Sequence, residues 1–116
     1  MTELRDLRER TRDYALRVIR LYNALPKRGA ANVLGYQMLR SGTSVGAHYR
    51  EAIRSRSSAE YAAKLNSGLM ELEETLYWLE LLEGAGLVSQ RRLSSLEDES
   101  SQLIAIPVSL IKKSKH

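Results

Sequence analysis

Four polar residues on one face of a helix are the strongest candidates for chemistry in this sequence. Arg40, Ser44, His48 and Glu51 recur every three or four residues, so they occupy about one quadrant of a helix. A cation, a hydroxyl, an imidazole and a carboxylate are groups that act in general acid–base catalysis. Two turns separate Arg40 from His48, however, and a lone histidine in a helical bundle is usually a hydrogen-bonded structural residue. We therefore favour a structural role and keep a helical nuclease as a distant third hypothesis.

Other catalytic and metal-binding patterns do not occur in the sequence. The chain has no cysteine, which excludes disulfides, thiolate nucleophiles and thiolate metal sites. A di-iron carboxylate bundle requires Glu-x-x-His on two helices, and neither His48 nor His116 has a glutamate three residues earlier. We predict no catalytic residue, no metal site, no cofactor and no enzymatic activity.

The partners of the polar face are predicted on the following helix. The short segment 55–58 forces the two helices to run antiparallel, and a hairpin centred near residue 57 places residue i opposite roughly residue 114 − i. This register pairs Arg40 with Glu74 and Glu51 with Lys64. We predict an interhelical polar seam, at least partly shielded from water, that consists of Arg40, Ser44, His48, Glu51, Lys64, Glu71 and Glu74.

Four amphipathic segments position these residues. Apolar residues at heptad spacing predict helices over about residues 2–25, 30–54, 59–83 and 89–113. Residues 26–29, which include a proline and a glycine, and residues 84–86, which include two glycines, are typical helix ends. No segment alternates as a strand does. The sequence predicts one all-α domain over residues 1–116, an antiparallel up-down-up-down four-helix bundle.

Small residues form a stripe on the second predicted helix. Gly35, Gly42 and Gly46 lie on one side of it, although each glycine costs a helix roughly 1 kcal/mol relative to alanine. The stripe predicts the close approach of another helix. The stripe and the region of Tyr77 and Trp78, which we expect to be exposed, offer more packing surface than one bundle requires. Close packing or oligomer contacts are therefore predicted at Gly42, Gly46, Tyr49 and Trp78.

Charge is unevenly distributed along the chain. The formal net charge of the 116 residues is +4, and the pI is about 9.6. Residues 57–88 nevertheless hold one basic group and six acidic ones. We expect the arginines of the first helix to be solvated and paired within that helix, as in Asp6–Arg10 and Asp13–Arg17. Tentative nucleic-acid-binding residues are Arg17, Arg20, Arg50, Arg54 and Arg56, which would contact phosphates without sequence preference.

Two segments carry a resemblance to a known family. Residues 40–52, RSGTSVGAHYREA, are followed at helical distance by Lys64-Leu65 and then by residues 73–82, EETLYWLELL. This arrangement resembles the four-helix-bundle family of 23S rRNA intervening-sequence proteins, and the likeness extends from about Tyr14 to the C-terminus. Members of that family usually have asparagine at the position of His48.

The resemblance implies a bacterial protein that forms a homopentameric ring with a basic surface. Related accessory proteins of diversity-generating retroelements bind reverse transcriptase and RNA. We expect a non-enzymatic oligomeric scaffold with a candidate surface for RNA or DNA. The alternative is a protein-binding adaptor without nucleic-acid binding. No apolar run reaches the ~20 residues that span a bilayer, and the first residues lack a signal-peptide pattern, so we expect no membrane contact and a cytoplasmic location.

Overall fold

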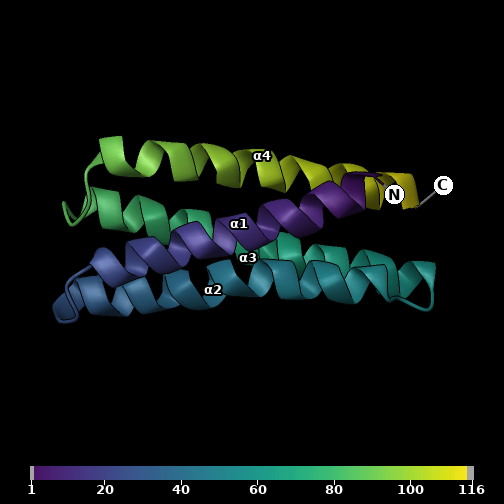
Figure 1. The fold of residues 1–116 in the computed structure, drawn as a ribbon, viewed down its shortest axis with the longest axis horizontal. Coiled ribbons are helices and arrows are strands. Elements are labelled where there is room, and N and C mark those ends of the chain that lie inside the picture. Colours follow the sequence, from purple (N-terminus) through teal and green to yellow (C-terminus); the bar gives the residue numbers. More distant parts are fainter. Residues whose placement is uncertain (1, 115–116) are drawn as a thin grey trace.

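The computed structural model describes residues 2–114, with side chains described for residues 6–113. The chain forms four helices: α1 (Thr2–Ala24), α2 (Gly29–Ile53), α3 (Ser58–Gly84) and α4 (Gln90–Ser114). They run alternately up and down along a rod of 45 × 21 × 19 Å (Figure 1). The predicted all-α antiparallel bundle is confirmed, and each helix end lies within one residue of its predicted position.

Local residues explain where the helices begin and end. Pro26 follows α1, and Gly29 opens α2 with a left-handed φ of 61°. The side chain of Ser57 accepts a hydrogen bond of 3.0 Å from the backbone N–H three residues later and caps α3. Gly86, with φ of 73°, turns the chain after α3, and Ser89 caps α4 in the same way at 3.3 Å. These short turns make consecutive helices antiparallel neighbours.

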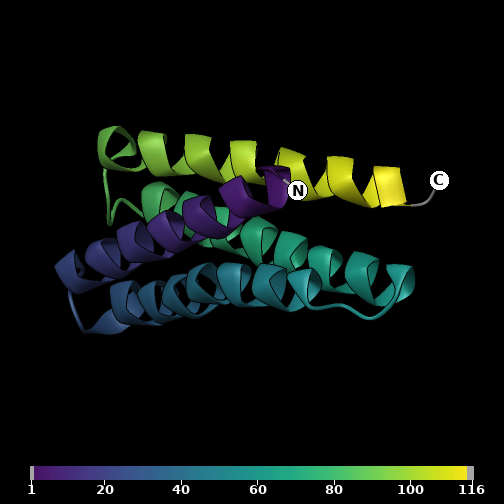
Figure 2. The same cartoon turned by 45° about the vertical axis from the view of Figure 1, so that its right-hand side comes forward.

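The four helices are not packed equally. α2 and α3 lie side by side, while α1 packs on α2 and α4 packs on α3. α1 runs obliquely, so that its C-terminal end lies beside the start of α2 and its N-terminal end approaches α4 (Figures 1 and 2). The contact between α1 and α4 is therefore the smallest between neighbouring helices.

The heptad positions fill the interior of the bundle. The largest fully buried apolar side chains are Tyr14, Tyr49, Leu7, Met38, Leu65, Leu72, Leu79, Leu82, Leu93, Leu103, Val18 and Val45. Pro107 is also buried, and α4 continues through it to Ser114. Burial of this apolar set is the main force that holds the helices together.

A layer of hydroxyl groups crosses the middle of this core. Tyr14, Ser41, Thr75 and Ser100 come from α1, α2, α3 and α4, and each is 0% exposed. The Tyr14 hydroxyl lies 2.6 Å from Ser100 Oγ, and Ser41 Oγ lies 2.7 Å from Thr75 Oγ1. Ser100 in turn donates to the Leu96 carbonyl at 2.8 Å. Because buried hydroxyls must find partners, this hydroxyl layer favours one relative register of the four helices.

The glycine stripe of α2 faces α1. A Cβ at Gly42 would lie 2.9 Å from both methyl groups of Val18, and one at Gly46 would lie 3.1 Å from Thr11 Oγ1. The predicted close approach is therefore present, but it occurs within the chain. Both glycines contribute to the α1–α2 contact, in which Gly42 is buried and Gly46 is partly exposed.

Tyr49 and Trp78, for which close packing or an oligomer contact was predicted, also pack within the chain. Tyr49 is 1% exposed and lies against α3, where a Cβ at Gly68 would come within 2.2 Å of its ring. Trp78 is half-buried against the core, and its indole Nε1 is buried with no hydrogen-bond partner. Tyr49 is therefore enclosed within the chain, whereas Trp78 remains partly exposed beside Tyr77, with the two ring centroids 5.2 Å apart.

Candidate functional site

The polar seam between α2 and α3 contains both ion pairs expected from the hairpin register. Arg40 Nη2 lies 2.8 Å from Glu74 Oε1, and Lys64 Nζ lies 3.6 Å from Glu51 Oε1. These side chains are 36–50% exposed, so both pairs are partly shielded from water. Ser44 belongs to the seam by position only, because its hydroxyl donates to the Arg40 carbonyl at 2.7 Å.

Glu71 and His48 form the inner part of the seam. Glu71 is 15% exposed and lies 3.5 Å from both Arg40 Nη1 and His48 Nε2. The other ring nitrogen of His48, Nδ1, lies 3.1 Å from Glu51 Oε1. This hydrogen bond, assisted by Lys64, lowers the pKa of Glu51. The histidine thus bridges two carboxylates from two helices, a geometry that holds α2 to α3.

The α2–α3 hairpin carries four exposed apolar side chains, of which the sequence analysis had singled out Tyr77. Val33 and Tyr36 on α2 are 61% and 56% exposed. Met70 and Tyr77 on α3 are 55% and 52% exposed. We call these four residues the apolar flanks, because they lie on the outward sides of the two helices that form the seam.

The five arginines proposed for nucleic-acid binding do not lie on one surface. Arg17 turns toward α4, where its Nη2 donates to Ser95 Oγ at 2.8 Å. Arg50 and Arg54 instead line a cleft between α1 and α2, together with Ile53 and with Arg8. Arg8 was missed because the periodicity of α1 does not reveal which of its outer faces lies against α2.

The remaining two arginines of that set are separate as well. Arg20 is exposed on α1, and Arg56 lies in the turn before α3, where its backbone N–H donates to Glu60 Oε2 at 3.0 Å. The predicted basic surface is therefore divided into at least two parts. Two of the five, Arg50 and Arg54, line one cleft together with Arg8 and Ile53, hereafter the arginine cleft.

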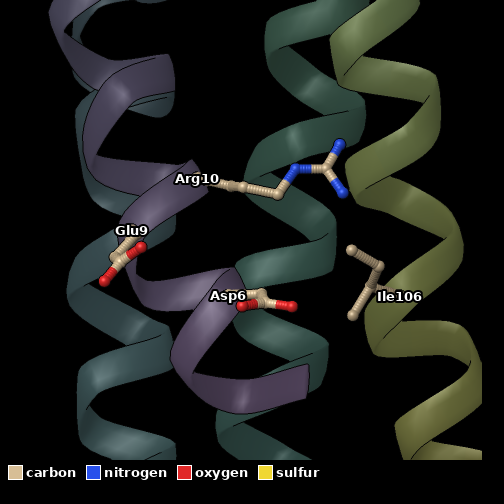
Figure 3. Close-up of a pocket in the computed structure, with 4 residues that line it drawn as sticks. All are labelled: Asp6, Glu9, Arg10 and Ile106. Carbon is tan, nitrogen blue, oxygen red and sulfur yellow. The ribbon is translucent and has the colours of Figure 1, made fainter. Parts of the chain in front are cut away.

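A second groove lies between α1 and α4 (Figure 3). It is lined by Asp6, Glu9, Arg10 and Ile106, and Figure 3 shows Arg10 extending from α1 toward α4. There the guanidinium donates to both carboxylate oxygens of Glu99, at 3.2 Å from Nε and 2.9 Å from Nη2. This bidentate bond raises the pKa of Arg10. Glu99 thus takes the place of the partner that we expected within α1, so the prediction of an Asp6–Arg10 pair was wrong.

The other pair expected within α1 is not formed either. Arg17 is engaged with Ser95, and Asp13 lies 3.7 Å from Arg12 in a largely exposed contact. Among the described residues, no group of three or more histidine, aspartate or glutamate side chains has a geometry suited to a metal ion. Within residues 2–114, no helix combines the length and hydropathy needed to cross a membrane.

The fold and these surfaces can be compared with known proteins. The family model described as "23S rRNA-intervening sequence protein" matches residues 5–109. This chain belongs to the 23S rRNA-intervening sequence protein family. A crystal structure from Bacteroides thetaiotaomicron VPI-5482, described as a protein with unknown function from the S23 ribosomal protein family, is similar to it at 34% identity and a TM-score of 0.89. The similarity covers 95% of this chain and 98% of that chain.

A search of curated proteins finds no match. Membership of the 23S rRNA-intervening sequence family therefore establishes the fold and leaves the activity to be inferred from the surfaces of this chain. Among the described residues, candidate binding surfaces include the polar seam with its apolar flanks, the arginine cleft, and the groove beside Arg10.

Proposed function

We propose that this 23S rRNA-intervening sequence family member is a non-enzymatic scaffold that self-associates through the outer face of the α2–α3 hairpin. The observation that supports this is the exposure of the apolar flanks, Val33, Tyr36, Met70 and Tyr77, each of which is more than half exposed. Large apolar side chains gathered on one face of a small protein mark sites of protein association.

A second copy of the chain is the partner that this face fits best. Between the apolar flanks, Arg40 and Lys64 supply positive charge while Glu71 and Glu74 supply negative charge. A surface that carries both signs offers complementary patches for the head-to-tail contacts of a ring, in which one part of the face meets a different part of the face of the next subunit. The resemblance noted from the sequence implies a ring of five subunits, and we take a homopentamer as the expected assembly.

Catalysis is not part of the proposal, and the inner seam supports this. His48 lies between the carboxylates of Glu51 and Glu71, and the Ser44 hydroxyl donates to a backbone carbonyl in its own helix. A histidine held by two carboxylates, with no nucleophile bonded to it, is suited to fastening helices together. We assign the seam a structural role in the hairpin that presents the apolar flanks.

Light scattering coupled to size-exclusion chromatography tests the assembly. The wild-type protein should have the mass of an oligomer, and the double variant Tyr36→Ser/Tyr77→Ser should be a folded monomer by circular dichroism. Ile19→Ser is a matched control, because Ile19 is 36% exposed but lies on α1. A wild-type protein that is monomeric at micromolar concentration would overturn the proposal, as would a double variant that assembles unchanged.

A second candidate function is nucleic-acid binding through phosphate contacts. The supporting observation is the arginine cleft, which three arginines line on a basic protein. Replacing Arg8, Arg50 and Arg54 by glutamine should weaken binding to unrelated sequences about equally. It should also reduce the dependence of log affinity on log salt by roughly one unit for each phosphate that the variant no longer binds.

One outcome would redirect attention to the alternative function. If no strand binds even at low salt, where electrostatic attraction is least screened, the protein-binding adaptor becomes the leading alternative. Reverse transcriptase would then be the first partner to test by co-purification, since related accessory proteins bind it.

A further inference from the structure

The arginine cleft is a distinct structural feature of the α1–α2 contact. Arg50 and Arg54 lie one helical turn apart at the C-terminal end of α2, Arg8 faces them from α1, and Ile53 provides an apolar wall. The cleft has a volume of about 190 Å³. Sites for drug-sized ligands usually occupy ~300–1,000 Å³, so this cleft is suited to a single small group.

No carboxylate neutralises these three arginines. Within residues 6–113, Arg8, Arg50 and Arg54 form no ion pair, in contrast to Arg10 and Arg40, which are both held by glutamates. Like charges one helical turn apart repel each other, and the C-terminal end of the α2 dipole offsets only part of that repulsion.

Two acidic groups near the α2 end of the cleft along the chain are already engaged. Glu51, which adjoins Arg50 in sequence, is bound by His48 and Lys64. Glu60 accepts from the backbone of the α2–α3 turn. The side chains that line the cleft are three exposed arginines and one isoleucine, so the cleft carries a positive charge that an external anion can balance.

Guanidinium groups and phosphate oxygens match in geometry, because each arginine can donate two parallel hydrogen bonds. Proteins that follow a strand without recognising its end spread their cations along a groove. Here the charge is concentrated instead, since Arg17 is turned toward α4. A phosphate monoester carries a charge of about −1.5 to −2 at neutral pH, more than the single charge of a diester within a strand.

We propose that the arginine cleft binds a phosphate monoester, and that its ligand is the terminal phosphate of a nucleic-acid strand. This inference rests on the second candidate function, nucleic-acid binding. Arg8 and Arg54 hold the phosphate from opposite helices, Arg50 supplies the third cation, and Ile53 limits the access of water on one side. The site thereby selects strand ends over internal phosphates.

Fluorescence anisotropy with one short internally labelled strand tests the proposal. The strand is prepared with a phosphate at the 5′ end, with a phosphate at the 3′ end, or with hydroxyls at both ends. A phosphorylated strand should bind at least about tenfold more tightly than the hydroxyl strand, because it adds charge-assisted bidentate bonds. Inorganic phosphate and AMP should weaken the binding of the phosphorylated strands to the level of the hydroxyl strand and leave the binding of the hydroxyl strand unchanged.

Variants assign the effect to the cleft. Arg8→Gln and Arg54→Gln should each abolish the preference for phosphorylated ends while the protein remains folded by circular dichroism. Arg20→Gln is the matched control, because it removes the same charge from an exposed position of α1 outside the cleft. Loss of the preference in Arg20→Gln as well would show that overall charge is responsible and would overturn the proposal.

The probes separate this inference from the function on which it rests. Equal binding of all three strands would refute end recognition and leave nucleic-acid binding in place. If no strand binds but inorganic phosphate raises the melting temperature of the wild-type protein and not of Arg8→Gln, the cleft is a phosphate site and its assignment to a strand end is wrong. If neither the strands nor phosphate bind, both proposals fail.

Discussion

Two buried tyrosines provide a sharp test of how polar groups contribute to this bundle. Tyr14 and Tyr49 are 0% and 1% exposed, and both can be changed to phenylalanine by removing one hydroxyl. The Tyr14 hydroxyl is bonded to Ser100 at 2.6 Å, whereas the Tyr49 hydroxyl is buried with no hydrogen-bond partner. The same chemical change should therefore have opposite consequences at the two positions.

The expected magnitudes follow from these environments. Tyr14→Phe removes a buried hydrogen bond and leaves a small void, although Ser100 keeps its bond to the Leu96 carbonyl. We expect the free energy of unfolding to fall by about 1–2 kcal/mol. Burying an unpaired hydroxyl costs roughly 1–3 kcal/mol, so Tyr49→Phe should leave stability unchanged or raise it by up to about 1 kcal/mol.

Urea unfolding followed by circular dichroism, at one fixed protein concentration, measures both changes. Tyr36→Phe serves as the control, because the Tyr36 side chain is 56% exposed and its hydroxyl can bond to water. Equal losses of stability in the Tyr14 and Tyr49 variants would refute the reasoning. So would a Tyr49→Phe variant that is less stable than Tyr14→Phe.

The same residues should control stability at alkaline pH. Burial raises the pKa of Tyr14 to about 12 and also raises the pKa of Tyr49 above its ordinary value of 10.0. Because the folded state holds these phenol protons more tightly, their contribution is complete below the ordinary tyrosine pKa and is lost as pH rises above it. Each phenylalanine variant should show a shallower alkaline loss of stability than the wild-type protein, and identical profiles would contradict this.

Three further changes test the seam, the helix contacts and the acidic surface. Glu74→Ala should lower the free energy of unfolding by at most about 1 kcal/mol, because the Arg40–Glu74 pair is exposed and Arg40 keeps its contact with Glu71. Glu71→Ala should lower it by more, because the Glu71 side chain is the more buried of the two. The reverse order in chemical denaturation would refute this account of the seam. Gly68→Ala should lower the free energy of unfolding by about 1–3 kcal/mol, because the added Cβ would collide with the Tyr49 ring. At Gly84 an added Cβ has no neighbour within 4 Å, so Gly84→Ala should not lower the midpoint of unfolding. Equal shifts of the midpoint in the two variants would contradict this. Burial, together with Glu83 and Glu80, raises the pKa of Glu97, so the folded state loses stability as pH rises through that pKa. Glu97→Gln should therefore raise the melting temperature at neutral pH but not at acid pH, and a gain that is independent of pH would exclude this cause.

The architecture and much of the seam could be predicted because both follow from periodicity. Leucines at heptad spacing identify the core face of a helix, and a short hairpin then fixes which residues of α2 and α3 lie at the same height. That is why Arg40 could be assigned to Glu74 and Lys64 to Glu51. The second contact of Arg40, with Glu71, and the contact of Glu71 with His48 depend on side-chain conformations that spacing does not determine.

The hydroxyl layer was not predicted, because serine and threonine also occur on surfaces and in turns and their presence in a helix does not by itself indicate burial. Ser100 occupies a heptad position between Leu96 and Leu103, which is a signal that could have revealed its burial. Its partner, however, is Tyr14, which is 86 residues away in the chain. Only the packing of α1 against α4 identifies that contact.

The glycine stripe shows a different limit. The spacing of Gly42 and Gly46 correctly predicts a helix in close contact, but it cannot distinguish α1 of the same chain from a helix of a second copy. The structure shows that the contacting helix is α1 of the same chain, because the oblique course of α1 places Val18 and Thr11 against the glycines. The same oblique course places Arg8 beside Arg50, so the arginine cleft was also beyond prediction from periodicity alone.

The two proposed binding surfaces are compatible because they use different parts of the bundle. The apolar flanks lie on the outer side of the α2–α3 hairpin, whereas the arginine cleft lies between α1 and the end of α2. Self-association through the flanks would therefore leave the clefts open and would repeat them around a symmetric assembly. Since linked sites bind a multivalent partner more tightly than one site does, a cleft with modest affinity for a single phosphate could hold several strand ends together. An assembly of this kind would gather nucleic-acid ends without reading their sequence, which is a role that needs neither a catalytic residue nor a base-specific contact.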